Sequence, residues 1–234
     1  MDLLSREILL VDKPAGLSSF AVVARVRRIY TEQVRTDALH KNQTPPKRAK
    51  VGHAGTLDPF ATGLLICLLG KGTKKATEFL KLDKKYQATI CLGKTSTTGD
   101  IEGEISETNF SGIPEATQVQ KVVESFRGEI EQKVPAYSAV KINGKRAYEL
   151  ARKGIAAEMP VRKVQIYDIS IIDYAWPYLK IACHVSSGTY IRTLGEDIGR
   201  KLGIGGYLTE LRRTQIGKYK ISDAITLAEL GITD

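Results

Sequence analysis

The sequence has few of the residues that hold metals or form disulfides. Of its 234 residues only three are cysteine and three are histidine. The cysteines are odd in number and form no Cys-x-x-Cys pair. Cys67 and Cys91 lie in apolar, strand-like stretches, so we interpret them as reduced core thiols. The histidines are scattered along the chain and have no metal-ligand spacing, so no metal is expected.

Long apolar runs are also missing. The longest, at residues 64–69, is far too short to span a bilayer. The first residues, Met-Asp-Leu-Leu-Ser-Arg-Glu, lack the basic and apolar regions of a secretion signal. We therefore expect a cytoplasmic protein that does not associate with membranes.

Positive charge, by contrast, is plentiful. The chain has 35 Lys and Arg against 26 Asp and Glu, a formal net charge of +9. Such a balance favours a polyanionic partner, with nucleic acid the first candidate and a generally basic protein the alternative. The hydrophobic content of 42% supports a normal packed core, and the length fits one large domain.

Hydrophobic periodicity predicts strands interleaved with helices. An apolar strand at 8–11 precedes a helix of about three turns that Ser18 or Ser19 caps. Residues 31–50 are polar and basic and predict a loop, either a solvated linker or an RNA contact. Strands are further predicted at 64–69, 85–92, 128–132, 164–174 and 178–185, and helices at 72–80, 117–126, 147–153 and 189–202. Asn143-Gly144 predicts a hairpin. The pattern indicates an α+β fold with a mixed, largely antiparallel sheet.

The most informative stretch is residues 52–65, Gly-His-Ala-Gly-Thr-Leu-Asp-Pro-Phe-Ala-Thr-Gly-Leu-Leu. Asp58 followed by Pro59 is a typical helix start, so one reading makes Asp58 an N-cap. The capping-box position holds Ala61 instead of Glu or Gln, and the turn carries three glycines and His53. The second reading makes Asp58 a catalytic carboxylate.

Two later segments carry further candidate residues. Tyr86 follows the basic stretch 81–85, and Arg192 lies in Ser186-Ser187-Gly188-Thr189-Tyr190-Ile191-Arg192-Thr193-Leu194. An arginine there can offer a planar fork to a carboxylate. Taken alone, Tyr86 could be a core residue and Arg192 a surface ion pair of little energetic value.

Together these blocks resemble the TruB family of tRNA pseudouridine synthases. The resemblance runs nearly end to end, through Lys13–Ser19, Gly52–Leu65, Lys85–Ala88, Thr97–Asp100, Gln132–Gly144, Ser187–Leu194 and Leu211–Arg213. It implies the α+β pseudouridine synthase fold, with a mixed, largely antiparallel central sheet, flanking helices and an RNA-binding cleft. The implied reaction converts uridine to pseudouridine at position 55 in the T-arm stem-loop of tRNA, without a cofactor.

The resemblance also implies roles for individual residues. Asp58 would be the catalytic carboxylate, Arg192 would keep it ionised, and Tyr86 would stack on the flipped uracil and take part in proton transfer. The substrate-binding residues implied are His53, Tyr86, Asp100, Tyr190 and Leu211. Asp100 matches an acid that lies near the RNA during base flipping.

Two departures from the family pattern stand out. A basic inserted loop at about 31–48 precedes the 52–65 block, and the chain reaches Asp234 without the C-terminal RNA-binding PUA domain. We therefore expect a single catalytic domain, residues 1–234, acting as a monomer.

Three alternatives remain open at this stage. The first is a sister pseudouridine synthase acting on ribosomal or other RNA, whose additional domains are not expected here. The second is a tRNA-folding chaperone without essential catalysis, against which the complete set Asp58, Tyr86 and Arg192 argues. The third is an aspartyl-phosphate phosphotransferase, which needs more carboxylates for Mg²⁺ than residues 52–65 offer.

Overall fold

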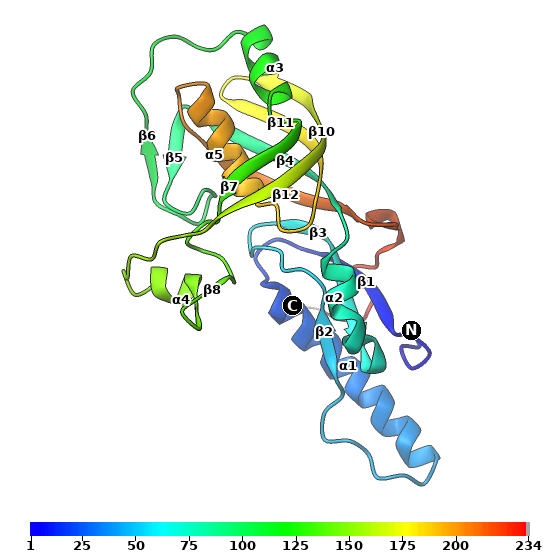
Figure 1. The fold of residues 1–234 in the computed structure, drawn as a ribbon. Helices are drawn as coiled ribbons and strands as arrows, with labels where there is room; N and C mark the ends of the chain where they lie inside the picture. The colour runs from blue at the N-terminus through cyan, green and yellow to red at the C-terminus, as the bar shows by residue number, and fades with distance from the viewer. Residues whose placement is uncertain (233–234) are drawn as a thin grey trace. The chain divides into compact units, whose positions relative to one another are not determined.

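The computed structural model describes residues 1–232, which form two compact units (Figure 1). The first unit contains Met1–Lys85 and the chain from Arg212 onward, and the second contains Tyr86–Leu211. Strands β4 (Lys84–Leu92) and β12 (Gly206–Ile216) have residues in both units. Because two compact units can belong to one domain, the expectation of a single domain stays a prediction.

Strand β3 (Thr62–Leu69) is the centre of the first unit's sheet. Strand β1 (Ile8–Lys13) pairs with it antiparallel along one edge. The opposite edge is shared by β2 (Val51–His53), which is antiparallel, and by the end of β12, which is parallel. The short strand β13 (Tyr219–Lys220) folds back and pairs antiparallel with the end of β12.

The apolar run of β3 is buried on both faces, as its continuous pattern predicts. Leu65, Cys67 and Leu69 join a core cluster with residues of β1 and α1. The alternate residues of the strand pack on Phe79 and Ile216 in a second cluster. Phe79 belongs to the second of two short helical segments, η1 (Gly70–Lys75) and α2 (Ala76–Leu80). A further helical turn, η2 (Ile221–Asp223), follows β13.

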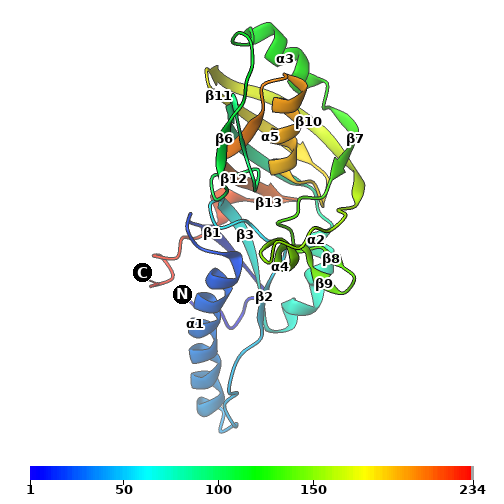
Figure 2. The ribbon, with the colours of Figure 1, turned by 90° about the vertical axis from the view of Figure 1, so that its left-hand side faces the viewer.

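Helix α1 (Ser19–His40) is longer than the sequence predicts. Ser18 caps it, as expected, and accepts a hydrogen bond of 3.1 Å from the amide of Ala21. The predicted loop over 31–40 is wrong, because these residues continue the helix. The chain then turns and runs back along α1 to β2 (Figures 1 and 2). The basic insertion is therefore half helix and half returning segment.

The second unit is built on a sheet whose strands lie in the order β12, β4, β11, β10 and β7. The new strands are β7 (Gly128–Lys133), β10 (Val161–Ala175) and β11 (Tyr178–Val185). β10 pairs antiparallel with both β7 and β11. These pairings, together with those of β3, confirm the predicted α+β class with a mixed, largely antiparallel sheet.

Helix α5 (Ile191–Lys201) packs closely on this sheet, and α3 (Ala116–Glu124) lies near it (Figure 2). A side chain at Gly199 would approach the backbone of Gly205 to 2.2 Å, so this contact requires glycine. Leu194 and Ile198 of α5 are fully buried. The sheet and α5 thus share one core, as the predicted strand–helix pattern indicates.

Two hairpins and a short helix complete the second unit. Strands β8 (Lys141–Ile142) and β9 (Lys145–Arg146) form the predicted hairpin, with positive φ angles of 49° at Asn143 and 82° at Gly144. Helix α4 (Ala147–Ala151) follows it directly. Strands β5 (Lys94–Ser96) and β6 (Ile105–Glu107) form a second hairpin.

The three cysteines are free and buried, which confirms the prediction made for Cys67 and Cys91. Burial raises the pKa of the Cys67 and Cys183 thiols to about 12, so these thiols are not nucleophiles near neutral pH. Among residues 1–232, no helix is both long and apolar enough to cross a membrane. In the same residues, His, Cys, Asp and Glu form no group of three that could hold a metal ion.

Candidate active site

Asp58 lies in a loop, not at the start of a helix. The chain leaves β2 at His53, passes through the loop and enters β3 at Thr62. A turn follows Asp58, in which the amide of Ala61 donates to the Asp58 carbonyl at 3.2 Å. The helix-cap reading is therefore wrong. No helix forms after Asp58 because the chain from Thr62 onward pairs with β1 as strand β3. Asp58 is half-buried in this loop.

Two buried side chains hold the residues on either side of Asp58. Ser19 Oγ accepts a hydrogen bond from the Leu57 amide at 2.8 Å and donates to the Leu57 carbonyl at 3.0 Å. Lys13 Nζ, with its residue 0% exposed, donates to the Pro59 carbonyl at 3.1 Å. The Gly16 amide donates to the same carbonyl at 2.9 Å. The backbone flanking the carboxylate is thus fixed from both directions.

A third buried side chain, Arg213, holds the first half of the loop. Its Nη2 donates to the Gly55 carbonyl at 3.0 Å and its Nε donates to the Leu64 carbonyl at 2.8 Å. Arg213 is 1% exposed. A Cβ at Gly63 would stand 2.3 Å from the Arg213 carbonyl, so glycine is required where β12 meets β3. A loop fixed in this way is a preorganised support for a reacting group.

His53 is the last residue of β2 and lies partly buried in the same unit. Burial lowers its pKa, and the positive charge of Arg213 lowers it further, against a smaller opposing effect of the Gly55 backbone. The imidazole is therefore neutral near pH 7 and offers hydrogen bonds without a charge. Such a group suits contact with a nucleotide's polar edges or sugar.

The remaining candidate residues belong to the second unit. Tyr86 lies near the start of β4 and is 9% exposed, on the same strand face as Ala88 and Ile90. Leu211 is buried on β12. Both side chains thus project from the sheet itself, which fixes the backbone that carries them.

Arg192 and Asp100 lie together, although 92 residues separate them in the sequence. Nη1 of Arg192 is 3.4 Å from Oδ2 of Asp100, and both side chains are almost fully buried. Arg192 also donates to the Thr98 carbonyl through Nη1 and to the Tyr137 carbonyl through Nη2, each at 2.8 Å. Three acceptors thus hold the guanidinium in one orientation.

Asp100 is almost fully buried and is held by its own loop as well as by Arg192. Its Oδ1 accepts hydrogen bonds from Thr98 Oγ1 at 2.6 Å and from the Glu102 amide at 3.0 Å, and the residue is 2% exposed. Because the carboxylate is buried against Arg192, it is placed to orient that arginine. Its expected contact with the RNA stays a prediction.

Tyr190 immediately precedes α5 and is half-buried. Gln132, 1% exposed, fixes its backbone: Gln132 Oε1 accepts from the Tyr190 amide at 3.0 Å and Nε2 donates to its carbonyl at 3.2 Å. The Tyr190 side chain packs on a small cluster that includes Val134 and Met159. Its position is therefore set by long-range contacts and not by the helix alone.

Comparison with known proteins now decides the family. Residues 41–191 match the model described as TruB family pseudouridylate synthase (N terminal domain). Residues 192–232 match the model of the tRNA pseudouridylate synthase B C-terminal domain. This chain belongs to the TruB family. The resemblance carried by the sequence motifs is thereby confirmed.

Individual TruB relatives are similar over most of the chain. The tRNA pseudouridine synthase B of Bordetella avium is 44% identical over 226 residues, covering 95% of this chain and 86% of the relative. That of Corynebacterium diphtheriae is 43% identical and is covered to 71% of its length.

Solved structures show the same fold. A chain of a Cbf5-Nop10-Gar1 complex superimposes with a TM-score of 0.68 and 28% identity, covering 97% of this chain. A chain of an H/ACA RNP bound to a substrate RNA containing 2′-deoxyuridine gives a TM-score of 0.64 at 26% identity. This TruB chain spans 56% of the length of each of those chains.

The sequence motifs of TruB contain residues whose roles the sequence alone did not reveal. Lys13, Ser19 and Arg213 hold the Asp58 loop, and Gln132 holds Tyr190. All four are polar and buried. The only sequence signal was their presence in the motif blocks, because the sequence does not show whether a polar side chain is buried or exposed.

Ser19→Ala should destabilise the fold by about 2 kcal/mol or more, because two buried backbone groups of Leu57 lose their partner. It should also slow the single-turnover reaction, because the loop that carries Asp58 loosens. Urea unfolding and a single-turnover assay measure the two effects. Ser18→Ala is the matched control: it removes a helix cap worth about 1 kcal/mol and leaves Leu57 untouched. Equal rates for the two variants would contradict the proposed support of the loop.

Proposed function

We propose that this protein isomerises uridine to pseudouridine at position 55 in the T-arm of tRNA. The observation that carries the proposal is Asp58, held in a braced loop, in a chain 44% identical over 95% of its length to a tRNA pseudouridine synthase B. The reaction needs a carboxylate of fixed position and no group beyond the protein and the RNA. We further propose that the protein acts as a monomer in the cytoplasm.

The chemistry gives each proposed residue a task. The N1–C1′ bond of uridine breaks, the uracil turns, a C5–C1′ bond forms, and the proton from C5 leaves while N1 gains one. Positive charge develops on the sugar during this cleavage, as in glycoside hydrolysis, and a carboxylate stabilises it. Asp58 is proposed as that carboxylate, and Arg192 as the cation that keeps it ionised.

Recognition of the base is proposed for the other candidate residues. The target uridine is stacked in a folded arm and must be flipped out, which costs a few kcal/mol. Tyr86 would stack on the flipped uracil, Tyr190 and Leu211 would line its pocket, and His53 would contact the nucleotide. Asp100 is proposed to position Arg192, since it is buried against it.

Incubation of the purified protein with an unmodified tRNA transcript tests this function. Carbodiimide treatment followed by reverse transcription should give one strong stop that reports pseudouridine at position 55. A transcript carrying cytidine at that position is the control and should give none. A protein that leaves the tRNA unmodified at all concentrations would overturn the proposal.

A second candidate is pseudouridine formation in ribosomal or other RNA. It is favoured by the likeness to the H/ACA RNP chain, although the identity there is only 26% against 44% to the Bordetella avium relative. A ribosomal RNA transcript in the same assay separates the two. Modification of the tRNA alone supports the first candidate, and modification of the ribosomal transcript alone supports the second.

Tyr86→Phe should bind tRNA about as well as the wild type, because stacking survives loss of the hydroxyl. Its single-turnover rate should fall by at least about tenfold if the phenol transfers the C5 proton. Filter binding and rapid-quench kinetics measure the two quantities. Tyr207→Phe, also buried in the second unit, is the control for loss of a phenol outside the proposed site. A wild-type rate for Tyr86→Phe would leave Tyr86 as a stacking residue alone.

A further inference from the structure

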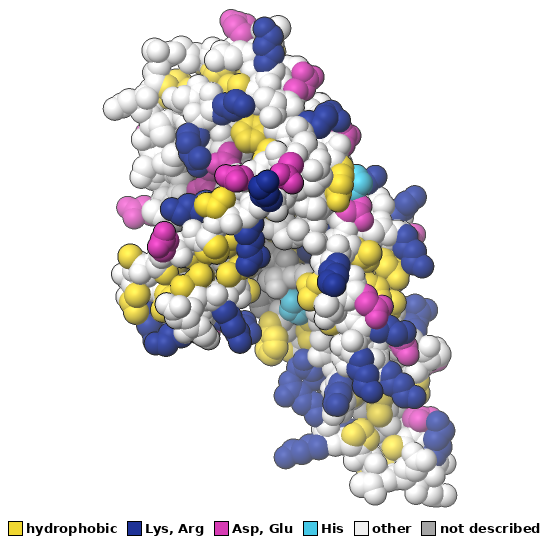
Figure 3. All heavy atoms as spheres, in the orientation of Figure 1, with side chains coloured by type: hydrophobic (Ala, Val, Ile, Leu, Met, Phe, Trp, Pro, Cys, Tyr) yellow, Lys and Arg dark blue, Asp and Glu magenta, His cyan; other side chains and the backbone are white. Residues whose placement is uncertain are grey.

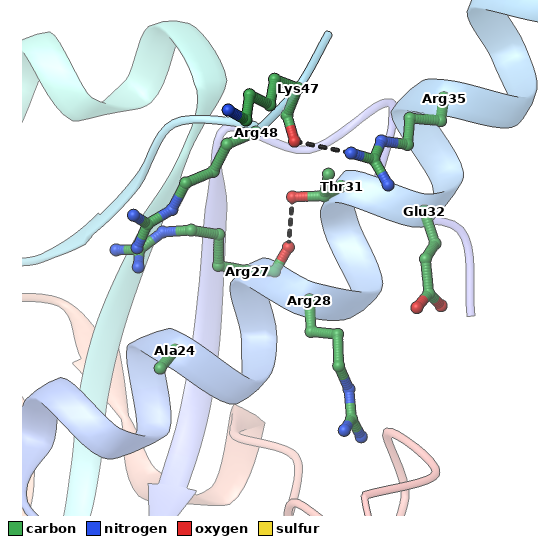
Figure 4. Close-up of a pocket in the computed structure, with 8 residues that line it drawn as sticks. All are labelled: Ala24, Arg27, Arg28, Thr31, Glu32, Arg35, Lys47 and Arg48. Atoms are coloured by element: carbon green, nitrogen blue, oxygen red, sulfur yellow. Dashed lines mark hydrogen bonds between the residues drawn. The ribbon is translucent and has the colours of Figure 1, made fainter. Parts of the chain in front are cut away.

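A basic pocket lies between α1 and the segment that returns to β2 (Figure 4). Its volume of about 250 Å³ has room for a phosphate group with bound water. The charged residues that line it are Arg27, Arg28, Glu32, Arg35, Lys47 and Arg48. Five of these six carry positive charge.

The returning segment is fastened to α1 and is not a free linker. Arg35 Nη2 donates to the Lys47 carbonyl at 2.7 Å. One helical turn earlier, Thr31 Oγ1 accepts from the Ala49 amide at 3.2 Å. These bonds fix the backbone on both sides of Arg48. The side chain of Arg48 is therefore presented from a defined position above the helix.

Arg27 and Arg48 form a pair of like charges. Figure 4 shows their guanidinium groups side by side. Arg27 Nη2 donates to the Val51 carbonyl at 2.8 Å, whereas its Nη1 is buried and no described residue accepts from it. Burial lowers the pKa of Arg27, and the charge of Arg48 lowers it further. Two adjacent cations, one of which has a buried donor that no described residue pairs, favour an anion at this point.

We propose that Arg27 and Arg48 bind a phosphodiester group of the RNA backbone; this rests on the proposed function for the identity of the RNA. Guanidinium forks match the geometry of phosphate oxygens. The nearby carboxylate of Glu32 does not neutralise the pair, because Glu32 and Arg28 extend away from it (Figure 4). The pair is called the guanidinium clasp below.

The charge around the clasp favours a polyanion over a small free anion. From residue 19 to residue 50 the chain has eight Lys and Arg against two acids, six of the nine excess positive charges of the whole protein. Figure 3 shows Lys and Arg side chains gathered where Figure 1 places α1 and the returning segment. A stripe of this kind is the electrostatic footprint of nucleic acid binding.

The clasp also lies next to the element that leads to Asp58. Arg27 bonds the carbonyl of Val51, the first residue of β2, and His53 ends that strand. Two residues of strand span about 7 Å. A phosphate held by the clasp is thus on the path along β2 to the candidate active site.

Arg48→Gln tests the clasp, because Arg48 is exposed and the change should leave the fold intact. Lys41→Gln is the charge-matched control, since Lys41 pairs with Asp37 at 2.8 Å at the far end of α1. Affinity for a full-length unmodified tRNA transcript is measured by fluorescence anisotropy between 50 and 200 mM salt. Arg27→Lys is a second variant, because a compact ammonium lacks the planar fork that bonds the Val51 carbonyl through one nitrogen and leaves a second nitrogen for a phosphate.

Arg48→Gln should weaken binding about tenfold at low salt, and Lys41→Gln by much less. Loss of one phosphate contact should flatten the slope of log K against log salt by about one unit. The advantage of the wild type over Arg48→Gln should therefore shrink about threefold between 50 and 200 mM salt. Arg27→Lys should behave like Arg48→Gln.

Equal losses for Arg48→Gln and Lys41→Gln, or an unchanged salt slope, would overturn the clasp. The clasp would also be overturned if the wild-type protein bound polyglutamate while Arg48→Gln kept its full affinity for tRNA. That result would indicate an acidic protein partner. The pseudouridine assay reports separately on the proposed function. If the wild type forms no pseudouridine yet Arg48→Gln still weakens RNA binding with a flatter slope, the clasp stands and the proposed function fails.

Discussion

Asp58→Asn should abolish pseudouridine formation while leaving tRNA binding nearly intact. Asparagine has the shape of aspartate without its charge, so the group proposed to stabilise the reacting sugar is removed and little else changes. Ser19 and Lys13 hold the loop through the backbone of Leu57 and Pro59, contacts that the substitution leaves in place. Loss of an essential carboxylate lowers a rate by about four orders of magnitude.

A single-turnover assay on an unmodified tRNA transcript measures this loss, and filter binding measures the affinity. Asp37→Asn is the matched control, because Asp37 pairs with Lys41 on the exposed face of α1 at 2.8 Å and such pairs contribute little. Measurable multiple turnover by pure Asp58→Asn would refute the catalytic assignment. The loop would then serve binding alone.

Much of the fold could be predicted, because its strands carry strong local signals. The continuous apolar run of β3 reflects burial on both faces, and Asn143-Gly144 adopts the positive φ angles that a tight hairpin requires. In both cases the residues that carry the signal are consecutive in the chain, so a local pattern reveals the element.

The length of α1 could not be predicted, because its second half is held by tertiary contacts. Residues 31–40 are mostly polar, and a local pattern of this kind favours a loop. In the structure Thr31 and Arg35 bond the returning segment, and Val34 packs against the core. Tertiary bonds thus supply what the periodicity lacks.

The helix-start reading of Asp58-Pro59, one of the two left open, fails for a related reason. Asp-Pro is a good helix start locally, but β3 begins at Thr62 and pairs with β1, so Asp58 and Pro59 stay in the loop that leads into the sheet. The site shows the same limit. Motif blocks indicated Asp58 and Arg192, whereas the contacts of Asp100 with Arg192 join positions far apart in sequence, which spacing cannot reveal.

Arg192→Lys should slow the single-turnover reaction by at least about a hundredfold, although it keeps the positive charge. The planar fork of Arg192 bonds the carbonyls of Thr98 and Tyr137 and pairs with Asp100. A compact ammonium on a different stem cannot hold these directions together. The substitution leaves the carbonyls of Thr98 and Tyr137 without their donors and lowers the free energy of unfolding by about 2 kcal/mol.

Two readouts separate a chemical role from a structural one. If Arg192 acts in the reaction, the rate falls far more than thermal stability or tRNA affinity accounts for, and the loss persists at saturating tRNA and at temperatures well below unfolding. Arg200→Lys is the control on the same helix, since Arg200 is exposed and pairs with Asp197 at 2.8 Å. A destabilised Arg192→Lys protein that still reacts at the wild-type single-turnover rate would make Arg192 a residue of the fold alone. Asp100→Asn should reproduce part of the loss in single-turnover rate, because Asp100 is proposed to act only by orienting Arg192.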